Sequence, residues 1–148
     1  MATYSFLDVN CSISGVGGNI NLASGAGVAE EGISIEAVED KSTMTIGADG
    51  SGMHSLHAST ASKISIKLLK TSPTNQLLMN MYNQQTSSAS NHGKNTITVS
   101  NQTIGETITI TSVAFKKVPT MAYAKEAGMN EWLFDGIKTA HTLGNYGA

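Results

Sequence analysis

The chain has 148 residues, enough for one domain with a buried core, but only 14% of them are charged, whereas ordinary soluble domains average about 25%. Its formal net charge of −2 argues against nucleic-acid binding through a basic surface as the main task. Cys11 is the only cysteine, which excludes an intramolecular disulfide and a thiolate metal cluster. Because Ser, Thr, Asn and Gly replace the missing charges, the surface is either covered by partners or polar without charge.

The N-terminal residues 1–6 contain neither a basic segment nor an apolar segment of the kind that forms a secretory signal. No run of apolar residues approaches the roughly 18 that a membrane-spanning helix needs. We therefore expect a protein that is made in the cytoplasm, has no membrane anchor and stays soluble until it meets a partner. No internal repeat or composition change divides the sequence, so we expect one domain over residues 1–148.

Alternation of apolar and polar residues with a period of two predicts strands along most of the chain. In the first third, residues 4–13 and 19–22 fit this pattern. Residues 32–38 and 43–46 alternate clearly and are separated by the polar residues 39–42. We therefore predict that these two segments pair as a hairpin.

Residues 47–62 contain too much glycine and too little periodicity for a confident strand, which predicts a long loop that could hold a short hairpin of its own. Long ordered loops inside a domain usually serve a function. The large apolar side chains of this loop suit a contact with another subunit. We predict that it is an assembly element, with Asp49, Met53, His54 and Leu56 as candidate contact residues.

One helix is predicted over about residues 73–86. Thr71 or Ser72 can cap it, and Pro73 suits the first helical position. Its apolar stripe, expected to pack on the sheet, consists of Leu77, Leu78, Met81 and Tyr82.

The remaining segments again favour strands. Strict alternation covers residues 63–70, and residues 95–100 and 106–115 form a second predicted hairpin. Residues 131–139 carry Trp132 and Phe134 in a last strand. The sequence therefore predicts a mainly β fold, a sandwich or barrel of about eight strands flanked by one α-helix.

A catalytic site is not evident. Gly50-Ser51-Gly52 is only a fragment of a nucleophile elbow. His54 and His57 lie among Ser, Gly and Ala, without the carboxylate or cysteine neighbours that metal sites usually have. We expect no enzymatic activity, no cofactor and no metal ion.

Four long strings resemble a family of short phage structural proteins that are encoded beside tail-sheath genes and are similar to the tail-tube subunits of contractile phages. These strings are residues 2–9 (ATYSFLDV), 25–36 (GAGVAEEGISIE), 44–57 (MTIGADGSGMHSLH) and 128–132 (GMNEW). The resemblance covers nearly the whole chain.

The resemblance implies the tail-tube fold, a β-sandwich with a flanking helix, in which six subunits form a ring and rings stack into a tube. About 24 strands at roughly 4.8 Å spacing would give an inner barrel about 37 Å across, which admits a DNA duplex. The implied partners are further copies of the chain, the tail sheath, baseplate and tail-terminator proteins, and double-stranded DNA that passes without specific binding. The implied location is the virion tail, assembled in the host bacterial cytoplasm.

Within this framework the polar face of the first predicted hairpin is expected to line the lumen, because its carboxylate would not trap a sliding polyanion. These lumen candidates are Ser34, Glu36, Thr43 and Thr45. The opposite face, Ile33, Ile35, Met44 and Ile46, is expected in the core. Lys63, Ser65 and Lys67, or Thr107, Thr109 and Thr111, offer the same alternation and remain alternatives.

Two alternatives to a tube subunit stay open at this point. One is another tail, baseplate or secretion-system tube component. The other, from a different class, is a small carbohydrate-binding β-sandwich, which would need exposed aromatic side chains on one face. Aromatic residues make up only 5% of the chain.

Overall fold

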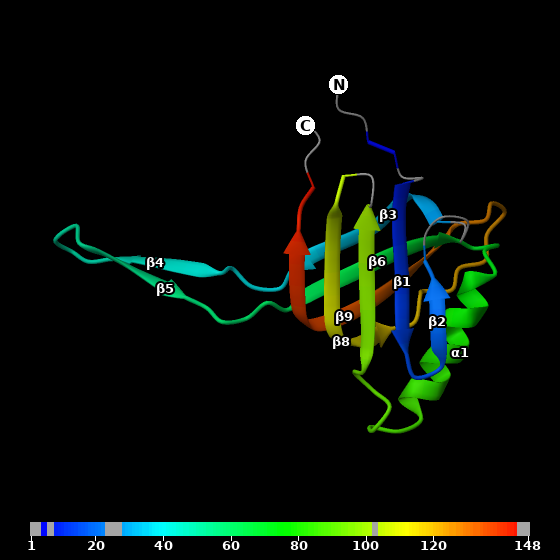
Figure 1. Cartoon of the computed structure of the whole chain (residues 1–148). Helices are drawn as coiled ribbons and strands as arrows, with labels where there is room; N and C mark the ends of the chain where they lie inside the picture. The colour runs from blue at the N-terminus through cyan, green and yellow to red at the C-terminus, as the bar shows by residue number, and fades with distance from the viewer. Residues whose placement is uncertain (1–3, 6–7, 23–27, 102–103, 145–148) are drawn as a thin grey trace.

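The computed structural model of this protein describes residues 4–5, 8–22, 28–101 and 104–144. In these residues nine strands and one helix are formed, and seven strands make one antiparallel sheet in the order β2-β1-β7-β8-β9-β6-β3 (Figure 1). The other two, β4 and β5, pair only with each other. The elements are β1 Val9–Gly15, β2 Gly18–Asn21, β3 Val28–Ala37, β4 Ser42–Ile46, β5 Gly52–Leu56, β6 Ser62–Leu69, α1 Thr74–Thr86, β7 Asn95–Asn101, β8 Glu106–Lys117 and β9 Met129–Thr142.

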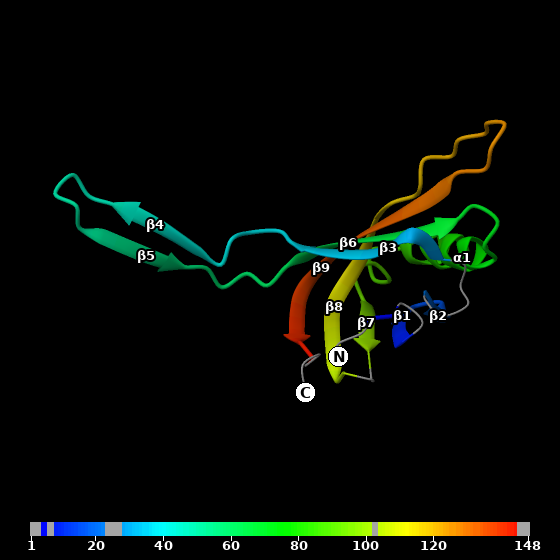
Figure 2. The ribbon, with the colours of Figure 1, turned by 90° about the horizontal axis from the view of Figure 1, so that it is seen from above.

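The seven-stranded sheet curls into a sandwich because its two longest strands bend from one layer into the other (Figure 2). These are β8, with 12 residues, and β9, with 14. In β8 the pairing with β7 shifts beside Ser112, whose φ is +54°. This bulge adds one residue, so the inward-facing positions change from Ile108 and Ile110 to Val113 and Phe115. The predicted mainly β sandwich with one helix is confirmed.

A glycine allows the matching bend of β9. Gly136 lies opposite Val113 of β8 and Ser62 of β6. A Cβ atom at this position would collide with the Ile110 side chain. The close approach of the strands at the bend therefore requires a residue without a side chain.

The core lies between the two layers and is centred on aromatic residues of β8 and β9. The Phe115 ring lies 4.8 Å from that of Phe134 and 6.0 Å from that of Trp132, measured between centroids. Tyr82 of α1 adds an edge-to-face contact to Phe115 at 5.6 Å. Aliphatic side chains of β1, β2, β6, β7 and α1 complete the cluster.

The helix prediction is confirmed within one residue, with Pro73 as the N-cap. Ser72 Oγ accepts a hydrogen bond from the Thr74 N–H at 3.3 Å. The predicted stripe is right for Leu78 and Met81, which are buried, and for Tyr82, which packs against the core, and it is wrong for Leu77, which is 52% exposed. Since the helix turns about 100° per residue, its buried face follows 74, 78, 81 and 85 instead.

The buried face of α1 includes one amide side chain, Gln85. Gln85 Nε2 donates to Asn95 Oδ1, and Asn95 Nδ2 donates to Gln85 Oε1, each at 2.6 Å. Gln85 Nε2 also donates to the Val16 carbonyl at 2.8 Å. This reciprocal pair joins the helix to β7 and to the β1–β2 turn without leaving its buried polar atoms unpaired.

The predicted hairpin of residues 32–38 with 43–46 is wrong. β3 pairs with β6, with Ile33 opposite Ile66 and Ile35 opposite Ile64. β4 instead pairs with β5, inside the stretch predicted as a loop. Alternation identifies a strand but not its partner, and the aliphatic residues of β6 matched β3 as well as those of β4 did.

The other predicted strands are confirmed with small shifts in their ends. Residues 63–70 correspond to β6, residues 95–100 and 106–115 to β7 and β8, and residues 131–139 to the middle of β9. Of residues 4–13, those from Val9 onward belong to β1, Tyr4, Ser5 and Asp8 lie outside it, and residues 6–7 fall outside the described part of the chain. In the described part of the chain, no helix has the length and apolar character needed to cross a bilayer.

Candidate assembly interface

A two-stranded hairpin projects from the sandwich between β3 and β6 (Figures 1 and 2). We call β4, β5 and the connecting residues 47–51 the arm. At its base, the His57 N–H donates to the Lys41 carbonyl at 2.8 Å, and His57 Nε2 lies 2.7 Å from Thr43 Oγ1. An isolated hairpin is at best marginally stable in water, so the arm needs a surface to rest on.

The pairing register gives the arm one largely apolar face. Met44 lies opposite His54, and Ser42 lies opposite Leu56. Directly opposed side chains share a face, and Ile46 follows Met44 on the same side. Met44, Ile46 and Leu56 are 62%, 56% and 80% exposed. We call Met44, Ile46, His54 and Leu56 the apolar face of the arm.

The opposite face of the arm is mainly polar. Thr43 pairs with Ser55 and Thr45 pairs with Met53. Since all the residues of β4 are exposed, the expectation that Met44 and Ile46 fill the sandwich core is wrong. Their alternation is real, but the described residues of their own subunit leave them exposed.

Asp49 shapes the tip of the arm. Its Oδ1 accepts hydrogen bonds from the Ser51 N–H at 3.0 Å and the Ser51 hydroxyl at 2.6 Å, which lower the pKa of this carboxyl. Gly50 supplies a φ of +88°, a conformation that glycine adopts without strain. Asp49 thus has a local role in the turn, whereas His54 and Leu56 lie on the apolar face and Met53 on the other.

The lumen candidates are divided between two places. Ser34 and Glu36 lie on β3, on the outer side of the sandwich, and Thr43 and Thr45 lie on the arm. Ser34 is paired with Ser65 and Glu36 with Lys63, so β3 and β6 share one face there. The alternative lumen residues of β6, Lys63, Ser65 and Lys67, therefore lie on the same surface as Ser34 and Glu36.

The outer face of the layer formed by β3, β6, β9 and the end of β8 carries alternating charges. Lys63 lies between Glu36 and Asp135 in one row across the strands. In a second row, Lys67 Nζ lies 3.7 Å from Glu131 Oε2. Carboxylates on neighbouring strands therefore offset these lysines. We call this surface the charged face.

The outer face of the opposite layer is nearly free of charge. Ser12, Thr98 and Thr109 follow one another across β1, β7 and β8, and Thr111 lies opposite Lys138 on β9. The third lumen alternative, Thr107, Thr109 and Thr111, lies on this second surface. The sandwich therefore has two chemically different outer faces.

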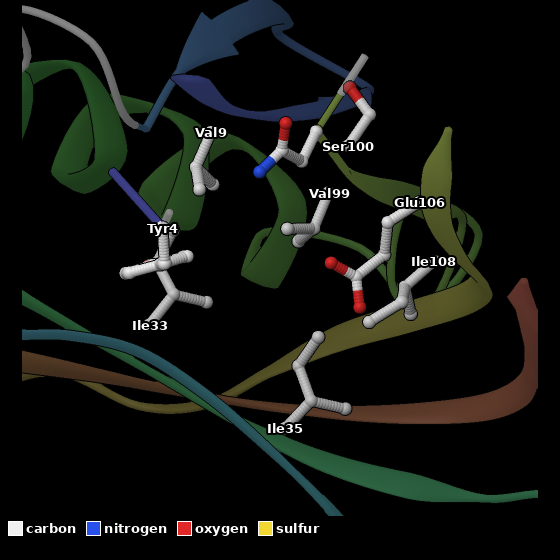
Figure 3. A pocket seen from close by; sticks show the side chains of 9 residues that line it. Tyr4, Val9, Ile33, Ile35, Val99, Ser100, Glu106 and Ile108 are labelled. Atoms are coloured by element: carbon white, nitrogen blue, oxygen red, sulfur yellow. The ribbon is translucent and has the colours of Figure 1, made fainter. Parts of the chain in front are cut away.

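An apolar cavity opens at the seam where the curled sheet fails to close, between β3 of one layer and β1, β7 and β8 of the other (Figure 3). It has a volume of about 310 Å³. Its lining residues are Tyr4, Val9, Ile33, Ile35, Val99, Ser100, Asn101, Glu106 and Ile108. Figure 3 shows the Glu106 carboxylate directed into this space.

Sequence reasoning missed this cavity. Alternation over residues 95–100 and 106–115 predicts a hairpin and does not single out Val99, Ile108 or Glu106. Alternation shows that such residues face inward, but it does not show where a curled sheet leaves a seam. In the described residues no group of three or more His, Cys, Asp and Glu side chains could hold a metal ion.

The fold is shared with solved assemblies of tube proteins. A chain from the sheath-tube complex of PVC, an extracellular contractile injection system, in its extended state has a TM-score of 0.59 and 10% identity, with 95% of this chain and 91% of that chain covered. A chain from the PVC sheath/tube terminator has a TM-score of 0.59 and 13% identity, with coverage of 97% and 99%. A chain from the tail of an empty GTA particle, determined with helical refinement and C6 symmetry, has a TM-score of 0.62 and 12% identity, with coverage of 95% and 100%.

No curated protein matches the sequence. A family model described as the bacteriophage PhiTE tail tube protein matches residues 1–144. This match spans both layers of the sandwich, the helix and the arm. The chain therefore belongs to the family of the PhiTE tail tube protein, and its role is that of a structural protein of the phage tail.

Proposed function

We propose that this protein is the tail-tube subunit of a contractile-tailed phage, that six copies close into a ring, and that stacked rings form the conduit for DNA. The observation that carries this proposal is a folded sandwich that presents a projecting arm with an uncovered apolar face, in a chain of a tail tube family. Large exposed apolar groups gathered in one place usually mark a contact with another protein. The C6 symmetry of the similar GTA tail supports a ring of six.

The edges of the sheet support ring closure. β3, ten residues long, ends the seven-stranded sheet on one side and pairs with β6 alone among the described strands. A long edge strand offers unpaired backbone groups to a neighbouring chain. In a closed ring the β3 edge of each subunit would be covered by the next subunit, which would continue the sheet around the tube.

We assign the lumen to the charged face. The four strands β8, β9, β6 and β3 are neighbours in this layer, and four strands from each of six subunits make the roughly 24-stranded barrel that the DNA diameter requires. Carboxylates lie beside Lys63 and Lys67, which weakens the attraction of these two lysines for phosphate groups. Lys116 and Lys117 at the end of β8 lie on the same face. Ser34 and Glu36 are then lumen residues, whereas Thr43 and Thr45 lie on the polar face of the arm.

The proposed partners are the tail sheath around the tube, a terminator protein, the baseplate, and DNA that slides through without specific binding. Assembly would take place in the host cytoplasm. The similar sheath-tube and terminator chains support the sheath and the terminator as partners.

A second candidate is a terminator that caps the tube, because a terminator chain is as similar in fold as a tube chain is. The two functions differ in how far assembly proceeds. A tube subunit makes heterologous contacts that repeat without limit along the axis, whereas a cap stops after one ring.

Electron microscopy of the purified protein, together with light scattering over a range of concentrations, tests the proposal. We expect hexameric rings at low concentration and long tubes about 37 Å wide between inner backbones at high concentration. Single rings that never stack would indicate the terminator function. A protein that remains monomeric at millimolar concentration would contradict both.

A further inference from the structure

The arm and the cavity have matching chemistry, although they lie on different parts of the subunit. The apolar face of the arm presents Met44, Ile46 and Leu56. The cavity presents aliphatic side chains from both layers, among them Ile35, Val99 and Ile108, which are only partly buried. Within the described residues, the seam leaves an open apolar cavity and the apolar face of the arm has no covering surface.

Each of the two surfaces also carries one ionisable side chain. His54 lies among the apolar residues of the arm, and the Glu106 carboxylate points into the cavity (Figure 3). Asn101 and Ser100 supply neutral polar groups at the same place. A histidine that donates to a carboxylate is a common pairing, and a charge-assisted bond of this kind fixes orientation as well as adding affinity.

The arm of the same subunit does not fill the cavity. It extends away from the sandwich in both views (Figures 1 and 2), and its exposed residues remain uncovered. We propose that the apolar face of the arm of one subunit fills the seam cavity of another copy of this chain, with His54 against Glu106. This inference rests on the proposed function, since it names the contact through which subunits of the tube hold one another.

The contact would be heterologous, because a patch on one part of the chain meets a pocket on another part. In an open stack such a contact leaves a free arm at one end and an empty cavity at the other, so further copies can be added. Within a closed ring the same contact would repeat from one subunit to the next. Burial of each fully covered Met, Ile or Leu side chain would favour the contact. The cost of ordering the arm reduces that gain.

Chemical cross-linking of assembled protein tests this inference. A variant with Tyr4→Cys and Leu56→Cys places one thiol at the mouth of the cavity, where Tyr4 is 61% exposed, and the other on the apolar face. The native Cys11 is buried, and burial raises the pKa of its thiol to about 12, so it will react little. We expect a short bismaleimide reagent to give a ladder of covalent oligomers.

The matched control is Tyr4→Cys with Thr45→Cys, which places the arm thiol on the polar face. We expect this control to form tubes and to cross-link at least about tenfold less, because its thiol points away from the cavity. Tubes in which both variants cross-link equally, or in which the Leu56→Cys variant does not cross-link, would overturn the inference and leave the proposed function standing. Failure of the parent protein to form rings or tubes would count against the proposed function instead.

A charge exchange provides a second measurement that does not depend on the reach of the reagent. We expect His54→Glu and Glu106→Lys each to raise the critical concentration for assembly by about tenfold or more. His54→Glu would face Glu106 with a second carboxylate, and Glu106→Lys would remove the carboxylate that pairs with His54. The double variant should return it to within about threefold of the parent value. Additive losses in the double variant would mean that these two residues do not meet.

Discussion

The sandwich and the arm have the same alternating sequence pattern but differ in what covers their apolar residues. Ile64 and Ile66 of β6 are fully buried between the two layers, whereas Met44 and Ile46 of β4 are more than half exposed. Both pairs alternate with polar residues on a strand. Alternation therefore indicates a strand with one apolar and one polar side. It does not show whether the apolar side is covered by the same chain or by another copy.

The largest effect is expected when the arm is removed, because this tests whether the arm serves assembly and the sandwich serves folding. Deletion of residues 49–56 should abolish tube formation and leave the sandwich folded, because no residue of the arm belongs to the core cluster. Circular dichroism and the urea midpoint of the unassembled protein check the fold, and electron microscopy checks assembly. Normal tubes from the deletion variant would show that the arm is not an interface.

The second prediction compares one large side chain from each region in the unassembled subunit. Trp132→Ala should lower the free energy of unfolding by about 3–5 kcal/mol, since it empties the centre of the core. Leu56→Ala should change it by less than about 0.5 kcal/mol, because the Leu56 side chain is 80% exposed. Urea unfolding of both variants decides this. A loss of more than about 1 kcal/mol for Leu56→Ala would mean that the arm packs on its own subunit.

The third prediction concerns the buried amide pair that attaches the helix to the sandwich. Gln85→Leu should lower the free energy of unfolding by about 1–3 kcal/mol, because Asn95 and the Val16 carbonyl lose their hydrogen-bond partner. Gln84→Leu is the control, since Gln84 is exposed on the same helix and should have little effect. Thermal unfolding below the assembly concentration measures the difference. Equal stability of the two variants would refute the pairing as a stabilising contact.

The smallest expected effect lies on the charged face. Glu36→Lys would replace a carboxylate by a further cation on a face that already carries Lys63, Lys67 and Lys116. Tubes should still form, while DNA ejection from virions should slow at low salt and recover at high salt, because screening weakens phosphate attraction. Glu36→Gln is the control for loss of charge alone. Ejection at the parental rate in low salt would place Glu36 away from the lumen.

The sequence predicted most elements but not their pairing. The strands at β6, β7, β8 and β9 and the helix at α1 follow from strict alternation, a helical stripe and Pro73. The partner of β3 did not follow, because Ile35 pairs with Ile64 and Ile33 with Ile66, 29 and 33 positions away along the chain. No local pattern in the sequence identifies a partner at that distance. β5 was anticipated only as part of a short hairpin that the loop could hold, because Gly52, Ser55 and the glycines at the tip obscure the alternation of a short strand.

Part of the candidate site could be predicted from local sequence patterns. His54 and Leu56 were named as contact residues because their apolar surroundings stood out in a glycine-rich stretch. The cavity was not predicted, since it arises from the curl of the whole sheet and from the bulge at Ser112. A local sequence pattern shows that a side chain is apolar and faces one side of a strand. Where a cavity opens depends on how the whole sheet curls.

Hydrogen exchange of the backbone amides, measured in the free subunit and in assembled tubes, tests the central claim most directly. The account predicts that amides of β6 and β9 are protected in both states, because they lie in the core of the sheet. Amides of β4 and β5 should exchange rapidly in the free subunit and become protected in tubes. Protection of the arm that is already complete in the free subunit, or that stays absent in tubes, would contradict the claim that another copy of the chain covers it.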